Sequence, residues 1–230
     1  LKLTFGKREN SRQETVMKKP PKKNLFIIIP GNPGMAYAYD YFIQALKKSH
    51  EEDLFYCHQH LGQASNDGFF PSLTIEDLIN DHKEFIEAKI KQHEDRNLIL
   101  IGHSLGGLLS LEIFKNKFFP IHKVFLLCPF IELSIPNIWF VKGLKKKGFQ
   151  KGLRRFVNIL GKAPVQLQRP IQKFFNLGEF GEQIFEDFNR ENFKYNFFSL
   201  LQRYPPHYEN LNLTHWLAEQ TTKEEKEKLF

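Results

Sequence analysis

The residues best suited to chemistry lie in the segment 102–106, which reads Gly-His-Ser-Leu-Gly. An aliphatic run at 97–101 precedes it and a helical pattern at 105–115 follows it, so the serine falls at a sharp turn between a strand and a helix. The two glycines leave room on both sides of that turn. The hydroxyl of Ser104 then projects at the N-terminus of a helix, where backbone N–H groups and the helix dipole favour a developing oxyanion. The segment therefore predicts a nucleophilic serine.

A simpler interpretation of the same segment is a glycine turn in which Ser104 only caps the following helix. The neighbouring His103 is not expected to be the base that activates the serine, because adjacent residues on such a turn point apart. We expect the His103 ring to pack beside the turn.

A second segment, 30–34, reads Pro-Gly-Asn-Pro-Gly and ends an earlier apolar run at 25–29. Enzymes with a glycine-x-serine-x-glycine turn place a loop after such a strand to donate an N–H group to the oxyanion. Pro33 has no N–H, so we expect the backbone N–H groups of Asn32 and Leu105 to form the oxyanion hole. The alternative is an ordinary turn between a strand and a helix.

Apolar runs and amphipathic helical patterns alternate along the first part of the chain, which indicates a parallel sheet built from strand-helix-strand units. Strands are expected at 25–29, 54–57, 97–101 and 124–128, and helices at 36–49, 73–92 and 105–115. This is the α/β class, and with the serine turn it indicates the α/β-hydrolase fold: a mostly parallel sheet, helices on both faces and a helical cap insertion. The expected divisions are a polar hairpin or loop at 1–24, the core at 25–133, the cap at 134–206, and at 207–230 a helix that returns toward the core.

Composition fits one globular domain with an insertion: 230 residues, 41% hydrophobic and 26% charged. The two cysteines, Cys57 and Cys128, fall in apolar stretches and are interpreted as core residues of a protein in a reducing compartment. No spacing of histidines or cysteines indicates a metal site, and no cofactor is expected.

The net charge of +7 is concentrated in the cap, where residues 133–178 hold ten basic and no acidic side chains. Apolar and basic residues alternate there at helical intervals, which is typical of a helix lying on a membrane or droplet surface. The residues expected to contact lipid are Trp139, Phe149, Lys151, Leu153, Arg154, Arg155 and Phe156. The alternative is a lid helix with a solvated basic face. Nucleic-acid binding is not expected, because no binding motif accompanies the charge.

Four segments together resemble the lipid droplet-associated hydrolase family over residues 25–133: Phe26 to Gly34, His82 to Ile86, Leu98 to Gly106 and Leu126 to Glu132. The resemblance implies a serine hydrolase fold, an intracellular location at lipid droplets and the endoplasmic reticulum, and turnover of neutral lipids such as sterol esters. The sequence departs from the family at Gln63, where the family pattern has a histidine, and in its more basic cap.

A nucleophilic serine also needs a histidine base and an acid, which follow it in this fold in the order serine, acid, histidine. Downstream candidates are Glu132, Asp187, His207 and His215, of which only Glu132 follows a core strand. We favour an acid and a base beyond Phe230, because residues 229–230 resemble the start of another strand. The 230 residues are then expected to be a fragment.

The sequence therefore predicts a carboxylic ester hydrolase, a lipase or esterase that acts on acyl esters at a lipid droplet surface. Two alternatives remain: a non-catalytic lipid-binding protein of the droplet surface on the same scaffold, and a thioesterase or acyltransferase that uses the same serine.

Overall fold

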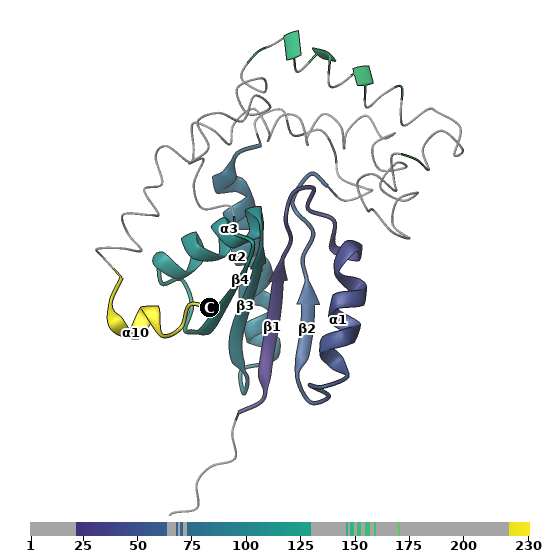
Figure 1. Cartoon of the computed structure of the whole chain (residues 1–230). Helices are drawn as coiled ribbons and strands as arrows, with labels where there is room; N and C mark the ends of the chain where they lie inside the picture. The colour runs from purple at the N-terminus through teal and green to yellow at the C-terminus, as the bar shows by residue number, and fades with distance from the viewer. Residues whose placement is uncertain are drawn as a thin grey trace, which may run out of the picture.

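Four parallel strands form the sheet on which the chain is built, in the spatial order β2-β1-β3-β4 (Figure 1). The structure, a computed structural model, describes residues 22–63, 68, 70, 73–129, 146, 148, 149, 151, 152, 155, 156, 159, 170 and 221–230. The elements are β1 (Asn24–Ile29), η1 (Ala36–Tyr39), α1 (Asp40–Lys47), β2 (Leu54–Cys57), α2 (Ile75–Gln92), β3 (Asn97–His103), α3 (Leu105–Lys115), β4 (Ile121–Leu127) and α10 (Lys223–Lys226).

The two central strands, β1 and β3, are buried on both faces, as their continuous apolar runs predict. Their side chains alternate between two cores. The core that includes α2 and α3 receives Leu25, Ile27, Ile29, Leu98 and Leu100. The core that packs against η1 and α1 receives Phe26, Ile28, Ile99 and Ile101. The sheet is thus covered by helices on both sides, and the predicted α/β-hydrolase core is confirmed in its arrangement.

The helix expected from residue 73 begins two residues later, because Thr74 caps it. The Thr74 hydroxyl accepts a hydrogen bond from the Asp77 N–H at 3.1 Å, and the Asp77 carboxylate accepts one from the Thr74 N–H at 2.7 Å. This reciprocal pair satisfies two backbone donors at the helix start. The helix therefore begins at Ile75.

Strand β4 differs from the prediction in its bounds and its burial. It starts at Ile121 and ends at Leu127, because Cys128 has φ 46°, a conformation that breaks the strand. Cys128 is exposed and Cys57 is half-buried, so the interpretation of both as core residues was wrong for Cys128. Both cysteines are free.

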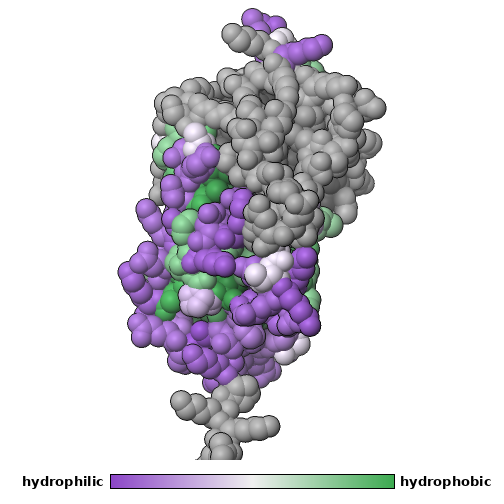
Figure 2. Space-filling model, turned by 90° about the vertical axis from the view of Figure 1, so that its left-hand side faces the viewer, coloured by the Kyte–Doolittle hydropathy of each residue, from purple (hydrophilic) through white to green (hydrophobic). Residues whose placement is uncertain are grey.

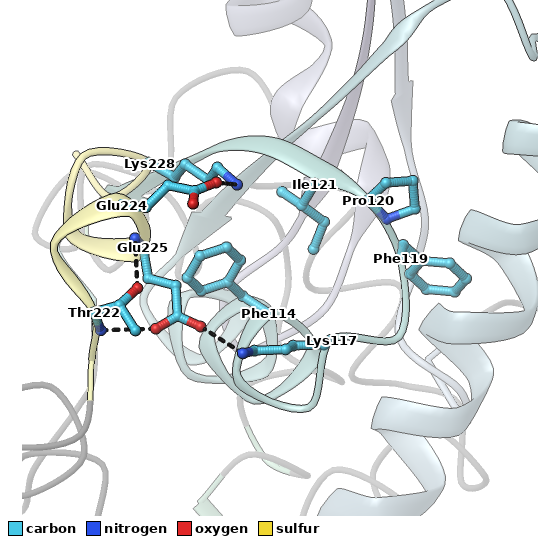
Figure 3. A pocket seen from close by; sticks show the side chains of 9 residues that line it. All are labelled: Phe114, Lys117, Phe119, Pro120, Ile121, Thr222, Glu224, Glu225 and Lys228. Carbon is cyan, nitrogen blue, oxygen red and sulfur yellow. Dashed lines mark hydrogen bonds and ion pairs between the residues drawn. The ribbon is translucent and has the colours of Figure 1, made fainter.

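The last residues of the sequence pair with the outer side of β4. Leu229 forms a parallel bridge with Val124, and Phe230 N–H donates to the Val124 carbonyl at 2.9 Å. Before this bridge, Glu225 of α10 accepts a hydrogen bond from the Thr222 backbone N–H and pairs with Lys117 at 3.0 Å (Figure 3). These contacts surround a pocket of about 370 Å³ at the C-terminal end of α3, away from Ser104.

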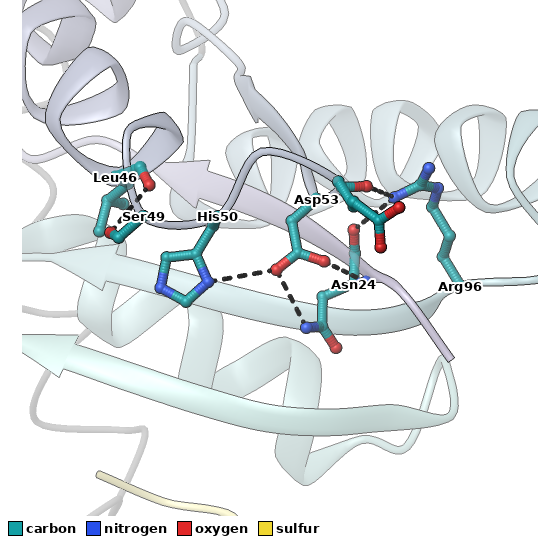
Figure 4. Close-up of polar contacts among 7 residues, drawn as sticks. Asn24, Leu46, Ser49, His50, Asp53 and Arg96 are labelled. Carbon is teal, nitrogen blue, oxygen red and sulfur yellow. Dashed lines mark hydrogen bonds and ion pairs between the residues drawn. The ribbon is translucent and has the colours of Figure 1, made fainter. Parts of the chain in front are cut away.

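At the amino edge of the sheet, polar contacts join the start of β1 to the turns before β2 and β3 (Figure 4). The Asp53 carboxylate accepts hydrogen bonds from the backbone N–H and the side-chain amide of Asn24, at 2.7 and 3.2 Å. Arg96 donates to the carbonyls of Asn24 and Glu52. The start of β1 is therefore fixed to the turns before β2 and β3, which leaves the carboxyl edge for the candidate site.

On the face shown in Figure 2, the surface of the described residues is mostly hydrophilic, with hydrophobic residues in separate patches. Among the described residues, the helices are all too short or too polar to cross a membrane.

Candidate active site

Ser104 lies at the junction of β3 and α3 with a backbone conformation that serine rarely adopts. Its φ is 50° and its ψ is −114°. Such a conformation costs on the order of 1–3 kcal/mol and persists only where the surrounding structure imposes it. The Ser104 side chain makes no capping hydrogen bond to α3. The interpretation of Ser104 as a simple helix cap is therefore wrong, and its hydroxyl is left for another purpose.

The two glycines of the turn are required by the close approach of neighbouring backbone. A Cβ on Gly102 would lie 2.5 Å from the Gly106 carbonyl oxygen and from the Ser110 hydroxyl. A Cβ on Gly106 would collide with the Ile29 carbonyl at the end of β1. The predicted need for small residues on both sides of Ser104 is thus confirmed.

The loop 30–34 lies directly beside Ser104. Ile29 pairs with Gly102 in the sheet, so the residues that follow β1 and β3 emerge side by side. A Cβ on Gly31 would be 3.0 Å from the Ser104 Cβ. From β1 the chain continues to β2 on one side, whereas β3 lies on the other side. The loop and the serine therefore meet at the point where the strand order reverses, which is where open α/β sheets bind ligands.

The two predicted oxyanion donors flank this point. Leu105 is the first residue of α3, so its backbone N–H has no acceptor within the helix. Asn32 follows Gly31 in the loop, and in the described part of the chain its buried side-chain oxygen has no hydrogen-bond partner. That both N–H groups point to one oxygen stays a prediction.

His103 packs beside the turn, as expected. Its Nδ1 lies 2.6 Å from the Tyr39 hydroxyl, and the two rings meet edge to face. Burial lowers the pKa of His103. In the part of the chain that the structure describes, the Ser104 hydroxyl has no histidine partner, so these residues alone do not supply its base.

Sequence reasoning missed a buried histidine pair, one member of which contacts the loop 30–34. The His60 backbone N–H donates to the Gly34 carbonyl at 3.0 Å, and a Cβ on Gly34 would collide with the His60 ring. His60 Nδ1 lies 2.9 Å from His82 Nε2. The only signals for this pair were a histidine just after β2 and another on the apolar side of α2.

Both histidines are held in the neutral form. Burial lowers the pKa of His60 to about 3 and holds the pKa of His82 well below its usual value.

The remaining predicted residues divide into two sets. In the cap, Phe149 is half-buried, while Lys151, Arg155 and Phe156 are exposed. The other predicted lipid contacts and triad candidates lie outside the described residues: Trp139, Leu153, Arg154, Glu132, Asp187, His207 and His215.

The sheet order, the helices on both faces and the strained serine turn define an α/β-hydrolase fold. Among solved structures, the chain is similar to an α/β-hydrolase fold protein from Burkholderia ambifaria, with 10% identity, a TM-score of 0.53 and coverage of 82% of this chain and 67% of that one. A deformylase from Pseudomonas putida is 11% identical with a TM-score of 0.52, covering 80% of this chain and 68% of that one. At these identities the likeness shows the fold alone.

The lipid-droplet associated hydrolase family matches residues 22–137, half of the chain, and the chain belongs to this family. It is 31% identical over 111 residues to the lipid droplet-associated hydrolase of Dictyostelium discoideum, covering 43% of this chain and 35% of that protein. It is 33% identical over 125 residues to the protein of that name from Homo sapiens, covering 48% of this chain and 38% of that protein. The matched part of the chain thus spans little more than a third of each relative.

The strain at Ser104 predicts an unusual order of stability between two variants. Glycine adopts a positive φ without penalty, so Ser104→Gly should be more stable than Ser104→Ala by about 1 kcal/mol. Urea unfolding measures both free energies. The control is Ser110 in the middle of α3, where Ser110→Ala should be more stable than Ser110→Gly by about 1 kcal/mol. The same order at both positions would contradict the strained conformation.

The buried histidine pair predicts that acid destabilises the fold. Below pH 6.5 the unfolded chain binds protons at His60 and His82 that the folded chain, with its lowered pKa values, does not bind. The free energy of unfolding should therefore fall between pH 6.5 and 4.5, by up to about 1.4 kcal/mol per pH unit for each histidine. Urea unfolding at several pH values measures the slope.

The double variant His60→Gln, His82→Gln should flatten this slope, while His122→Gln, at an exposed histidine of β4, should leave it unchanged. The range stops at pH 4.5 because below it the unfolded chain also protonates Glu225, whose pKa in the folded chain is lowered to about 2 by hydrogen bonds from Thr222. An equally steep slope in the double variant would contradict the role given to the pair.

Proposed function

We propose that this chain carries the nucleophile and the oxyanion hole of a serine ester hydrolase, which cleaves acyl esters of neutral lipids, such as sterol esters, at the surface of lipid droplets. The observation that carries the proposal is the strained backbone of Ser104, with φ 50° and ψ −114° and a side chain that does not cap its helix. Strained residues of this kind cluster at active sites, and this one lies within a glycine-flanked motif beside the loop 30–34. Family membership and the names of the two relatives support the hydrolase class and the droplet surface.

The proposed reaction begins when Ser104 Oγ attacks the carbonyl carbon of the ester and its proton passes to a histidine base. The carbonyl oxygen becomes an oxyanion that accepts hydrogen bonds from the N–H groups of Asn32 and Leu105. The intermediate collapses, the base returns the proton to the leaving alcohol, and an acyl-serine remains. Water activated by the same base then releases the fatty acid and restores the serine.

We place the acid and the base of this reaction outside the residues that the structure describes. In this fold both follow the nucleophile on loops after late strands. The parallel bridge between Leu229 and Val124 supports this placement, because the next strand of such a sheet pairs beside β4.

The cap is proposed as the surface that meets lipid. Phe156 is 53% exposed. Arg155 directly precedes it and Lys151 comes five residues before it, and both side chains are exposed. Apolar anchors beside basic residues suit the interface of a phospholipid layer, where the rings enter the acyl region and the cations meet anionic headgroups. By the same reasoning Trp139, Leu153 and Arg154 belong to this surface, at the droplet and the endoplasmic reticulum.

A fluorophosphonate probe tests the nucleophile. In the full-length protein, the probe should phosphonylate the wild type at Ser104, because an activated serine attacks its phosphorus. Ser104→Ala should show no labelling by mass spectrometry, whereas Ser110→Ala should be labelled like the wild type. A folded wild-type protein that stays unlabelled would contradict the enzyme and favour a lipid-binding protein on the same scaffold.

Flotation with artificial droplets tests the lipid surface. Droplets of a neutral oil coated with phosphatidylcholine and an anionic phospholipid should bind the protein. The double variant Lys151→Glu, Arg155→Glu should bind at least about 30-fold more weakly, because each basic residue contributes about 1 kcal/mol at an anionic surface. The matched control is Lys47→Glu with Lys48→Glu at the end of α1, where both lysines are exposed. Equal loss in both double variants would count against a specific surface.

A further inference from the structure

One hydroxyl group joins the two halves of the candidate active site. The Tyr39 hydroxyl accepts a hydrogen bond from the Gly31 backbone N–H at 2.7 Å and lies 2.6 Å from His103 Nδ1. Gly31 directly precedes Asn32 in the loop, and His103 directly precedes Ser104 in the turn. Tyr39 therefore contacts the residue before a proposed oxyanion donor and the residue before the proposed nucleophile.

The Gly31 backbone N–H fixes the direction of the first hydrogen bond, and we infer that the hydroxyl donates in the second. A tyrosine hydroxyl has one proton, and since its oxygen accepts from Gly31, that proton is free to be donated to His103 Nδ1. Burial raises the pKa of Tyr39 to about 12 and lowers the pKa of His103, so both groups stay neutral near pH 7. With the Tyr39 proton donated in this way, a neutral His103 carries its own proton on Nε2.

The fit around the hydroxyl leaves no room for a side chain at position 31. A Cβ on Gly31 would lie 2.9 Å from His103 Nδ1 and 3.0 Å from the Ser104 Cβ. Because residue 31 is glycine, the loop can pack against the serine turn while its N–H stays within hydrogen-bonding distance of the Tyr39 hydroxyl. The short contact and the bridging hydroxyl are independent observations of the same close approach.

We propose that Tyr39 is a positioning residue that holds the loop 30–34 against the serine turn and so sets the distance between the oxyanion donor of the loop and Ser104. The catalytic part of this inference rests on the proposed function. The two hydrogen bonds of Tyr39, to Gly31 and to His103, can be measured without any enzymatic activity. Reactivity depends steeply on such distances, because a displacement of about 1 Å can cost on the order of 10²-fold in rate.

The test removes the hydroxyl with Tyr39→Phe in the full-length protein and uses Tyr56→Phe as a matched control. The Tyr56 hydroxyl also hydrogen-bonds a histidine, His93 Nε2 at 3.0 Å, but it does so between β2 and the end of α2. Both variants thus lose the same kind of tyrosine–histidine bond. Only Tyr39→Phe should slow phosphonylation of Ser104, by about tenfold, which is less than the 10²–10³-fold loss expected for removing an oxyanion donor itself.

Two measurements read the bridge directly. Amide hydrogen exchange at Gly31 should be at least about tenfold faster in Tyr39→Phe than in the wild type, because the amide loses its acceptor. In the wild type, ¹⁵N spectra of the histidine rings should place the His103 proton on Nε2. Neither reading depends on labelling, and the second needs no variant.

The outcomes separate this inference from the proposed function. Faster Gly31 exchange together with slower labelling in Tyr39→Phe alone supports a positioning role. Labelling of Tyr39→Phe at the wild-type rate overturns that role, Gly31 exchange that is unchanged in Tyr39→Phe overturns the bridge, and a His103 proton on Nδ1 in the wild type overturns donation by the hydroxyl. If the wild type is not labelled at all, the proposed function fails, and Gly31 exchange decides whether Tyr39 holds the loop.

Discussion

The contact between the end of β1 and the turn after β3 is the constraint on which the rest of the site depends. Gly106 lies so close to the Ile29 carbonyl that no side chain fits between them, and Gly31 approaches Ser104 almost as closely. This packing forces the Ser104 backbone to a positive φ and keeps its hydroxyl away from the helix end. The energy of that strain is offset by the two buried cores, which fix β1 and β3 on both faces.

The loop that meets Ser104 is held from two directions by residues that perform no chemistry themselves. Tyr39 joins its first glycine to the serine turn, and His60 supports its last glycine through the Gly34 carbonyl. Burial keeps the Tyr39 hydroxyl and the His60 ring neutral, so the charge beside the loop does not change near pH 7. An oxyanion hole gains most when its donors are fixed before the reaction, so supports of this kind serve the proposed catalysis.

Local sequence patterns were sufficient to predict the buried central strands and the serine turn. The runs at 25–29 and 97–101 predicted buried strands because a parallel strand covered on both faces must be apolar throughout. The start of β4 was not predicted because His122 and Lys123 interrupt its apolar pattern. The start of α2 was placed too early, at Leu73, because the capping pair of Thr74 and Asp77 begins the helix after Thr74. Ser104 and its loop were predictable from short motifs. Tyr39 and His60 were not, since their roles arise only when the sheet brings distant segments together.

The central claim is that Ser104 is a nucleophile whose oxyanion is bound between the loop after β1 and the first turn of α3. A crystal structure of the full-length protein phosphonylated at its reactive serine tests it most directly. The account predicts an adduct on Ser104 Oγ, with the phosphonyl oxygen about 2.7–3.1 Å from the backbone nitrogens of both Asn32 and Leu105. A phosphonyl oxygen that points into solvent, or an adduct on another residue, would contradict it.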